Sequence, residues 1–265
     1  MNNLHTHTFR CKHAAGDAAD YAAAALSRGV QILGITDHTP LPDGRWESMR
    51  MGLAELGCYI QAIEEARLMF PGLQIWKGME CEYSREYHGF FADELLGTWK
   101  LDYLIASVHF FPLEGRWTGI DDRMQDWKVL KAYATYMIEA MRSGLFAFVA
   151  HPDMFGIGCG TWGENAASCA RDILEAAADL QLPLEINGYG FRKPRLNTTG
   201  GVRPMYPLEP FWEIAARYKI TVIANSDAHA PLDVAANIGD ALAIARKYGL
   251  QLADPSRLRR NGKEW

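Results

Sequence analysis

The chain has 265 residues, of which 49% are apolar, and this suits one globular domain with a substantial core. Its formal net charge of −5 excludes the broadly cationic surface that favours nucleic acids or membranes. No apolar run approaches the roughly 18 residues that span a bilayer, and the start of the chain lacks a signal-peptide pattern. Five cysteines without a CxxC pair indicate reduced thiols, so a soluble cytoplasmic protein is expected.

Short apolar, β-branched runs alternate with helical stretches along the chain. In chain order, the pattern predicts a strand over 2–6, a helix over 17–28, a strand over 29–35, a helix over 49–70, strands over 73–79 and 101–108, a helix over 126–142, a strand over 145–150, a helix over 165–180, a strand over 182–186, a helix over 208–218, a strand over 220–224 and a helix over 234–248.

This alternation predicts an α/β protein with a parallel sheet and crossover helices. A closed or nearly closed barrel, a (β/α)7 variant of the TIM barrel, fits the order of elements best. The alternative is an open doubly wound sheet, but the Gly-rich phosphate turn expected after its first strand is missing. Without a linker or low-complexity tract, residues 1–265 are predicted to form a single domain.

Histidines and carboxylates follow six of the predicted strands. They are His5 and His7, then Asp37 and His38, Glu80, His109, His151, and Asp227 with His229. The C-terminal ends of barrel strands form the face that carries active sites, so these side chains are expected to converge there. Seven of the eight histidines share this face when His13, in the loop after His7, is included. His88 lies apart and is interpreted as an ordinary surface residue.

The spacing and number of these residues predict more than one metal ion. In an extended chain, His5 and His7 point to the same side, and Asp227 and His229 repeat this arrangement. Zinc takes about four ligands, so seven histidines and two carboxylates exceed one ion. We therefore expect two or three ions with Glu80 as the bridging carboxylate, and the mixed nitrogen and oxygen donors suit Zn, Mn or Fe.

These residues resemble the successive motifs of the PHP (polymerase and histidinol phosphatase) superfamily, in the right order and over nearly the whole chain. The motifs are His5-Thr6-His7 with His13, Thr36-Asp37-His38, Gly78-Met79-Glu80, Ser107-Val108-His109, His151-Pro152-Asp153 and Ser226-Asp227-Ala228-His229. The resemblance implies a distorted (β/α)7 barrel and a trinuclear metal site with phosphoesterase activity.

Within the superfamily, the chain is most similar to PHP-type histidinol-phosphate phosphatases, through the stretches 36–42, 184–193 and 226–231. This similarity implies three ligand sets, which are His5, His7, Glu80 and Asp227 for one metal, Glu80, His109 and His151 for the second, and His13, His38 and His229 for the third. Glu80, Asp227 and His229 are thereby predicted to take part in catalysis.

The predicted contacts to substrate phosphate depart from the family pattern. A basic residue usually follows the His151 motif, whereas residues 154–170 contain no Arg or Lys. Arg192, in the Gly-rich segment after the sixth strand, is predicted to clamp a phosphate oxygen. Arg195 and Arg203 in the same loop are the further candidates for substrate binding.

A water shared by the metals is expected to be acidified and to act as a hydroxide nucleophile. Asp17, which also suits an N-cap of the first helix, is a candidate for protonating the leaving alkoxide. Asp37 and Asp153 are predicted to orient ligand histidines.

Three functions are compatible with this site. The first is a histidinol-phosphate phosphatase of histidine biosynthesis that acts on a small phosphorylated substrate. The second is a PHP phosphoesterase acting on another phosphomonoester, or on nucleotides or oligonucleotide ends, although the acidic charge argues against nucleic acid. The third is a non-catalytic metal-binding accessory module, which the complete ligand set disfavours.

Overall fold

A computed structural model describes residues 1–121 and 123–259. The chain divides into two compact units. The first unit comprises Met1–Ile105, Asn225–Ile238 and Arg259, and the second comprises 106–121, 123–224 and Gly239–Leu258. The single domain predicted over residues 1–265 stays a prediction, and residues 260–265 lie outside the described part of the chain.

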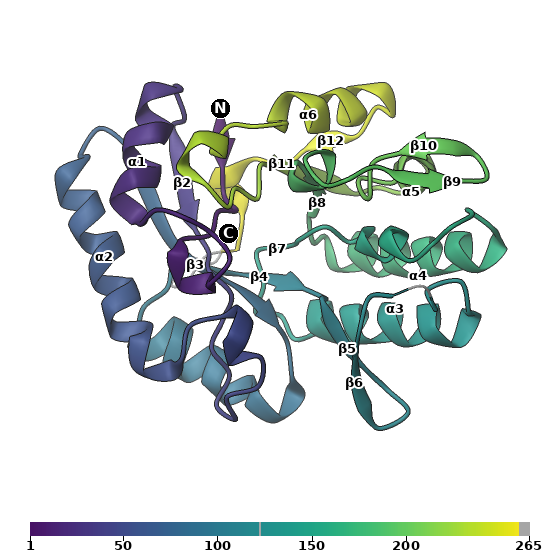
Figure 1. The fold of residues 1–265 in the computed structure, drawn as a ribbon, viewed down its shortest axis with the longest axis horizontal. Helices are drawn as coiled ribbons and strands as arrows, with labels where there is room; N and C mark the ends of the chain where they lie inside the picture. Colours follow the sequence, from purple (N-terminus) through teal and green to yellow (C-terminus); the bar gives the residue numbers. More distant parts are fainter. Residues whose placement is uncertain (122, 260–265) are drawn as a thin grey trace. The chain divides into compact units, whose positions relative to one another are not determined.

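The first unit is a parallel sheet covered by two helices (Figure 1). Strand β1 (Asn2–Asn3) pairs with β2 (Ile32–Ile35), β2 pairs with β3 (Gln74–Glu82), and β4 (Tyr103–Ser107) begins in this unit. The helices α1 (Ala18–Ser27) and α2 (Leu56–Met69) pack against each other. Because the strands are parallel, their carboxyl ends lie at one edge of the sheet.

The Tyr103 side chain fixes the start of the first unit against its sheet. Its hydroxyl donates a 2.8 Å hydrogen bond to the carbonyl oxygen of Leu4. A Cβ atom at Gly34 would lie 1.9 Å from this hydroxyl, and one at Gly78 would lie 2.8 Å from the Tyr103 ring. Glycine at both positions therefore allows the ring to reach the segment that carries the first two histidines.

The second unit also alternates strands and helices. Strand β7 (Phe148–Val149) pairs in parallel with β8 (Leu184–Asn187), and β11 (Thr221–Asn225) with β12 (Gln251–Leu252). The helices α3 (Trp127–Arg142) and α4 (Glu164–Leu180) lie side by side, and α5 (Glu209–Ala215) packs on α4 (Figure 1). Helix α6 (Ile238–Lys247) lies between β11 and β12 in the chain. Parallel pairing in both units agrees with the predicted α/β class.

Several predicted boundaries differ from the structure. The helix predicted to begin at Met49 begins at Leu56, because Gly52 is extended and the preceding residues form short 3₁₀ turns. A π-helix over Phe90–Thr98 and two antiparallel hairpins were not predicted. The hairpins are β5 (Phe110–Leu113) with β6 (Arg116–Gly119), and β9 (Leu196–Thr198) with β10 (Gly201–Arg203). Among the described residues, no helix is both long and apolar enough to cross a membrane.

Candidate metal centre

The two histidines after β1 point at the same pair of carboxylates. The Nε2 atoms of His5 and His7 lie 3.1 Å apart, and both rings are buried. Nε2 of His7 lies 3.4 Å from Glu80 Oε2 and 3.2 Å from Asp227 Oδ1. The corresponding distances from His5 are 3.5 and 3.6 Å. The alternation of side chains in an extended segment accounts for this convergence.

Glu80 lies at the centre of this group. Its Oε2 atom is also 2.9 Å from Nδ1 of His38, and its side chain is 1% exposed. The backbone of β3 places it there, because His38 and Glu80 form an isolated parallel bridge. The amide and hydroxyl of Thr39 donate to the Glu80 carbonyl oxygen at 2.9 and 3.0 Å. One carboxylate oxygen therefore faces three imidazoles, as a bridging ligand would.

Asp227 supplies the second negative charge. Its burial would raise its pKa, but the charge of His5 and a hydrogen bond from His7 hold the pKa well below its usual range. The side chain is therefore an ionised carboxylate at neutral pH. Asp227 has a φ of 49°, in the left-handed region that is uncommon for residues other than glycine. Such strain is concentrated at functional sites, where the surrounding structure maintains it.

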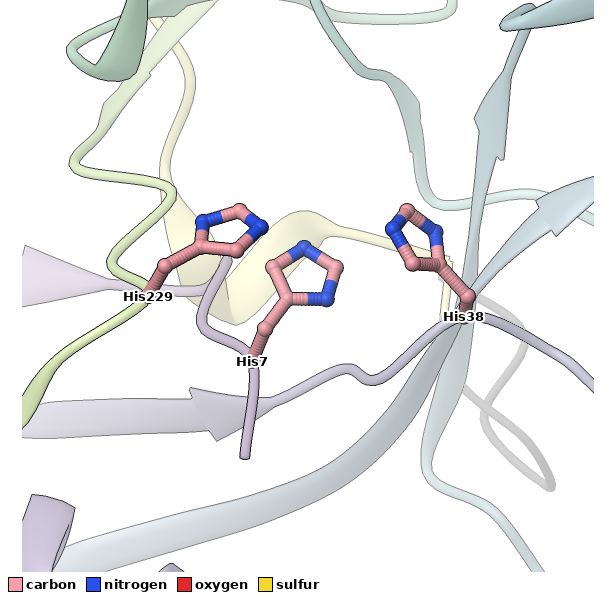
Figure 2. A group of neighbouring side chains, drawn as sticks. All are labelled: His7, His38 and His229. Carbon is pink, nitrogen blue, oxygen red and sulfur yellow. The ribbon is translucent and has the colours of Figure 1, made fainter. Parts of the chain in front are cut away.

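A second group of rings stands beside the first (Figure 2). His7, His38 and His229 each offer a nitrogen within 4.8 Å of the others, and their side chains point toward one another. The ring centroid of His7 lies 4.5 Å from those of both His38 and His229. The His13 ring lies 5.3 Å from that of His38 and 5.0 Å from that of His229.

The ring orientations of His13 and His229 suit metal binding. Nδ1 of His13 lies 2.6 Å from the carbonyl oxygen of Cys11, which can only accept, so Nδ1 is the donor in this contact. Nδ1 of His229 stands in the same relation to the Asp227 carbonyl at 3.1 Å. Burial and the neighbouring His7 hold the pKa of His229 well below its usual range, so this imidazole is neutral. Neutral imidazoles are the form that ligates metals.

The donors of the first unit fit a divalent metal site. We call this set the histidine–carboxylate cluster, and its members are His5, His7, His13, His38, Glu80, Asp227 and His229. All are imidazole nitrogens or carboxylate oxygens, the donors that Zn, Mn and Fe share.

Asp37 lies next to the cluster, and its role in orienting a ligand stays a prediction. Its carboxylate lies 3.9 Å from Nδ1 of His7 and accepts hydrogen bonds from the Thr8 amide and hydroxyl at 2.7 and 2.6 Å. Burial raises the pKa of Asp37 to about 6, although His7 and Thr8 oppose the shift. The hydrogen bonds therefore fix the turn that follows His7.

The second unit brings together the other two predicted ligands. The rings of His109 and His151 pack edge to face, with centroids 4.9 Å apart. His151 has a φ of 29°, and its backbone amide donates to Glu185 Oε2 at 3.1 Å. Asn187 donates to the same oxygen at 2.7 Å. Glu185 and Asn187 were not predicted as site residues, although two polar residues at a spacing of two on a buried strand could have indicated them.

Comparison with known proteins places the chain in a family. The profile of the PHP domain matches residues 3–188. A probable histidinol-phosphatase of Deinococcus radiodurans is 33% identical over 260 residues, which cover 92% of each chain. The chain belongs to the PHP family. The family predicted from the motifs is therefore confirmed.

A more distant relative is also a histidinol-phosphatase, and a solved structure shares the fold. The histidinol-phosphatase of Bacillus subtilis is 26% identical over 262 residues, 87% of this chain and 94% of that protein. The histidinol phosphate phosphatase of Lactococcus lactis, solved with zinc, L-histidinol and phosphate, is similar with a TM-score of 0.71 at 17% identity, over 95% of both chains. This structural similarity confirms the predicted PHP fold.

The three arginines predicted to bind substrate in this PHP protein have different surroundings. The Arg192 guanidinium lies 5.0 Å above the Tyr189 ring and donates to the Gly188 carbonyl at 3.3 Å. Arg195 is exposed. Arg203 is half-buried and donates to four carbonyl oxygens at 2.6 to 3.1 Å, those of Gly156, Cys159, Pro204 and Met205. Arg203 therefore anchors the β9–β10 hairpin, and the roles of all three in binding substrate stay predictions.

Three further residues are placed by their contacts. Asp17 is the N-cap of α1, accepts from the Ala18 amide at 2.7 Å and forms a two-point ion pair with Arg10. Its predicted role in proton transfer stays a prediction. Asp153, expected to orient a histidine, accepts from the Leu208 amide and the Trp212 indole and so holds the start of α5. His88 contacts the Tyr83 hydroxyl at 3.0 Å.

Proposed function

We propose that the chain is a metal-dependent phosphomonoester hydrolase that acts on histidinol phosphate. The observation that carries this proposal is the histidine–carboxylate cluster, in which Glu80 faces three imidazoles and Asp227 is held ionised. The histidinol-phosphatase relatives, one of them aligned over 92% of the chain, support the choice of substrate. On this proposal the enzyme works in histidine biosynthesis, in the cytoplasm.

The cluster would hold two of the proposed metal ions. His5, His7, Glu80 and Asp227 would bind one ion, and His13, His38 and His229 another. His109 and His151 are the proposed ligands from the second unit. Bound divalent ions would supply Lewis-acid activation of water and neutralise charge on the phosphoryl group.

The protein side chains have separate tasks in this scheme. Glu80 and Asp227 supply the negative charge that retains the cations, and Asp37 holds the turn that carries His7. Arg192 would bind a phosphate oxygen through its planar fork of donors. Asp17 is proposed to relay a proton from water to the leaving alkoxide, and its ion pair with Arg10 keeps its carboxylate at the start of α1.

Elemental analysis tests the metal stoichiometry. Protein purified in metal-replete medium is expected to contain two or three divalent ions per chain, with zinc, manganese or iron as the candidates. Treatment with a chelator should remove the ions and the phosphatase activity together, and one added metal should restore both. At most one tightly bound ion per chain after replete purification contradicts the proposal.

A panel of phosphomonoesters tests the substrate. Histidinol phosphate is expected to give a kcat/KM at least about tenfold above every other member, a difference equal to one contact of roughly 1.4 kcal/mol. The panel should include sugar phosphates, nucleoside monophosphates and a 3′-phosphorylated oligonucleotide. If another ester is preferred, the phosphatase assignment stands and the substrate is wrong. If none is hydrolysed by metal-loaded protein, the enzyme assignment fails.

A further inference from the structure

A buried ion pair lies next to the histidine–carboxylate cluster on β3. The guanidinium Nη2 of Arg50 donates to Glu82 Oε2 at 2.7 Å, and these residues are 2% and 1% exposed. Removing two charges from water costs several kcal/mol per ion in real proteins, and apolar residues of the same volume often stabilise a fold equally well. The stability of the fold therefore does not by itself explain why this ion pair is buried here.

Arg50 connects the two segments that carry His38 and Glu80. Its Nη1 donates at 2.9 Å to the carbonyl oxygen of Thr39, the residue after His38. Its other donor engages Glu82, which lies two residues after Glu80 on β3 and so projects from the same face of the strand. The closest contact in the cluster joins His38 and Glu80. The Arg50 side chain therefore binds one residue near each of these two ligands.

The link continues through the backbone to the ligand atoms. The Thr39 amide and hydroxyl both donate to the Glu80 carbonyl oxygen, and His38 is bridged to Glu80 in parallel register. This register places His38 Nδ1 2.9 Å from Glu80 Oε2. A shift of Thr39 relative to β3 would therefore change the distance between these two proposed metal ligands.

Arg50 is itself held in place. Its guanidinium carbon lies 5.0 Å from the Trp46 ring centroid, and the short 3₁₀ turn Glu47–Met49 precedes it. The contact with the Trp46 ring and the two hydrogen bonds leave the guanidinium little freedom. Lysine could pair with Glu82 but could not reproduce this geometry.

We infer that Arg50 and Glu82 form a positioning pair that sets His38 against Glu80 and thereby sets the affinity of the cluster for metal. This inference rests on the proposed function, because it assumes that the cluster binds metal. Partners outside the ligand set typically alter metal affinity or activity by about 10- to 100-fold when they are removed.

Zinc affinity of the metal-free protein tests the inference through a competing chromophoric chelator. Arg50→Met should weaken zinc binding by about 10- to 100-fold, and Arg50→Lys should recover only part of the loss. The double variant Arg50→Met with Glu82→Leu is decisive. It removes both charges, so net charge is unchanged and folding stability should be retained, yet zinc binding should stay weak because the link to Thr39 is lost.

Arg67 provides a matched control in the same unit. Its guanidinium likewise joins a carbonyl of β3, that of Ile75 at 2.8 Å, to a carboxylate, that of Asp102. Ile75 lies at the opposite end of β3 from Glu80. Arg67→Met should therefore lower the thermal stability while zinc affinity stays within about twofold of the parent value.

The outcomes separate the inference from the proposed function. Parental zinc affinity in the folded double variant, or an equal loss of affinity in Arg67→Met, contradicts the positioning role. If Arg50→Met does not fold, the double variant and Arg50→Lys decide in the same way. If the parent protein binds no zinc, manganese or iron, the proposed function fails and this inference falls with it.

Discussion

Replacing Glu80 by alanine is expected to remove bound metal and phosphatase activity together. Glu80 Oε2 lies within 3.5 Å of nitrogens on His5, His7 and His38, so its loss leaves three imidazoles without the anion between them. Metal ions supply several kcal/mol of charge stabilisation in the transition state, and kcat/KM should therefore fall on the order of 10³-fold or more. Metal content should fall by at least one ion per chain.

Elemental analysis and kinetics on the same preparations check this result. Glu80→Gln keeps the shape of the side chain and removes its charge, so it should lose metal nearly as fully as the alanine variant. His88→Ala is the control, because His88 contacts the Tyr83 hydroxyl and belongs to no proposed ligand set. Normal metal content in Glu80→Ala would show that Glu80 is not a bridging ligand, and a large loss of metal in His88→Ala would show that His88 is itself a ligand.

The members of the cluster were predictable from the sequence because local geometry governs them. Side chains two residues apart in an extended segment share a face, and this places His5 beside His7. Parallel strands end at one edge, and this brings His38 to Glu80 across 42 residues of chain. Neither argument requires knowledge of loops or of side-chain packing, so the prediction needed only the alternation of strands and helices.

The contacts that hold the ligands were not predictable in this way. Arg50 reaches Glu82 from a loop whose path depends on the extended Gly52 and on short 3₁₀ turns, and the sequence pattern there indicated a continuous helix. Glu185 and Asn187 are both polar residues on a buried strand, but the bond of Glu185 to the His151 amide depends on the pairing of β7 with β8. Asp153 was expected to orient a histidine. Its hydrogen-bond donors are instead the Leu208 amide at the N-cap of α5 and the Trp212 indole within α5.

The surroundings of the proposed substrate-binding residues, in the loop between β8 and α5, were also not predictable from the sequence. Charge and position in the sequence favoured Arg192, with Arg195 and Arg203 as further candidates. The structure distinguishes them, because Arg203 is engaged by carbonyl oxygens while Arg195 is exposed. Hydrogen bonds that involve a charged group contribute about 1.5–3 kcal/mol each, so Arg203→Ala is expected to destabilise the fold and must be analysed separately from a binding defect.

Arg192→Ala is expected to lower kcat/KM for histidinol phosphate by about 30- to 1000-fold while metal content stays intact. The loss of one charge-assisted bidentate contact to phosphate corresponds to roughly 2–4 kcal/mol. Arg192 is suited to this contact because its guanidinium stacks over the Tyr189 ring, and its hydrogen bond to the Gly188 carbonyl is long, at 3.3 Å. Arg192→Lys should recover only part of the loss, since an ammonium cannot reproduce the planar fork.

The other cations of the loop are the controls for this prediction. Lys193 stands over the same Tyr189 ring at 4.1 Å, so Lys193→Ala tests whether positive charge alone explains the effect. Arg195→Ala should cost as much as Arg192→Ala only if Arg195 supplies the cation that is missing after His151. Arg203→Ala should lower the thermal midpoint, and its kcat/KM should be corrected for the folded fraction. If all the folded variants hydrolyse histidinol phosphate like the parent, the metals alone bind the phosphate, and the loop serves only to cover the substrate.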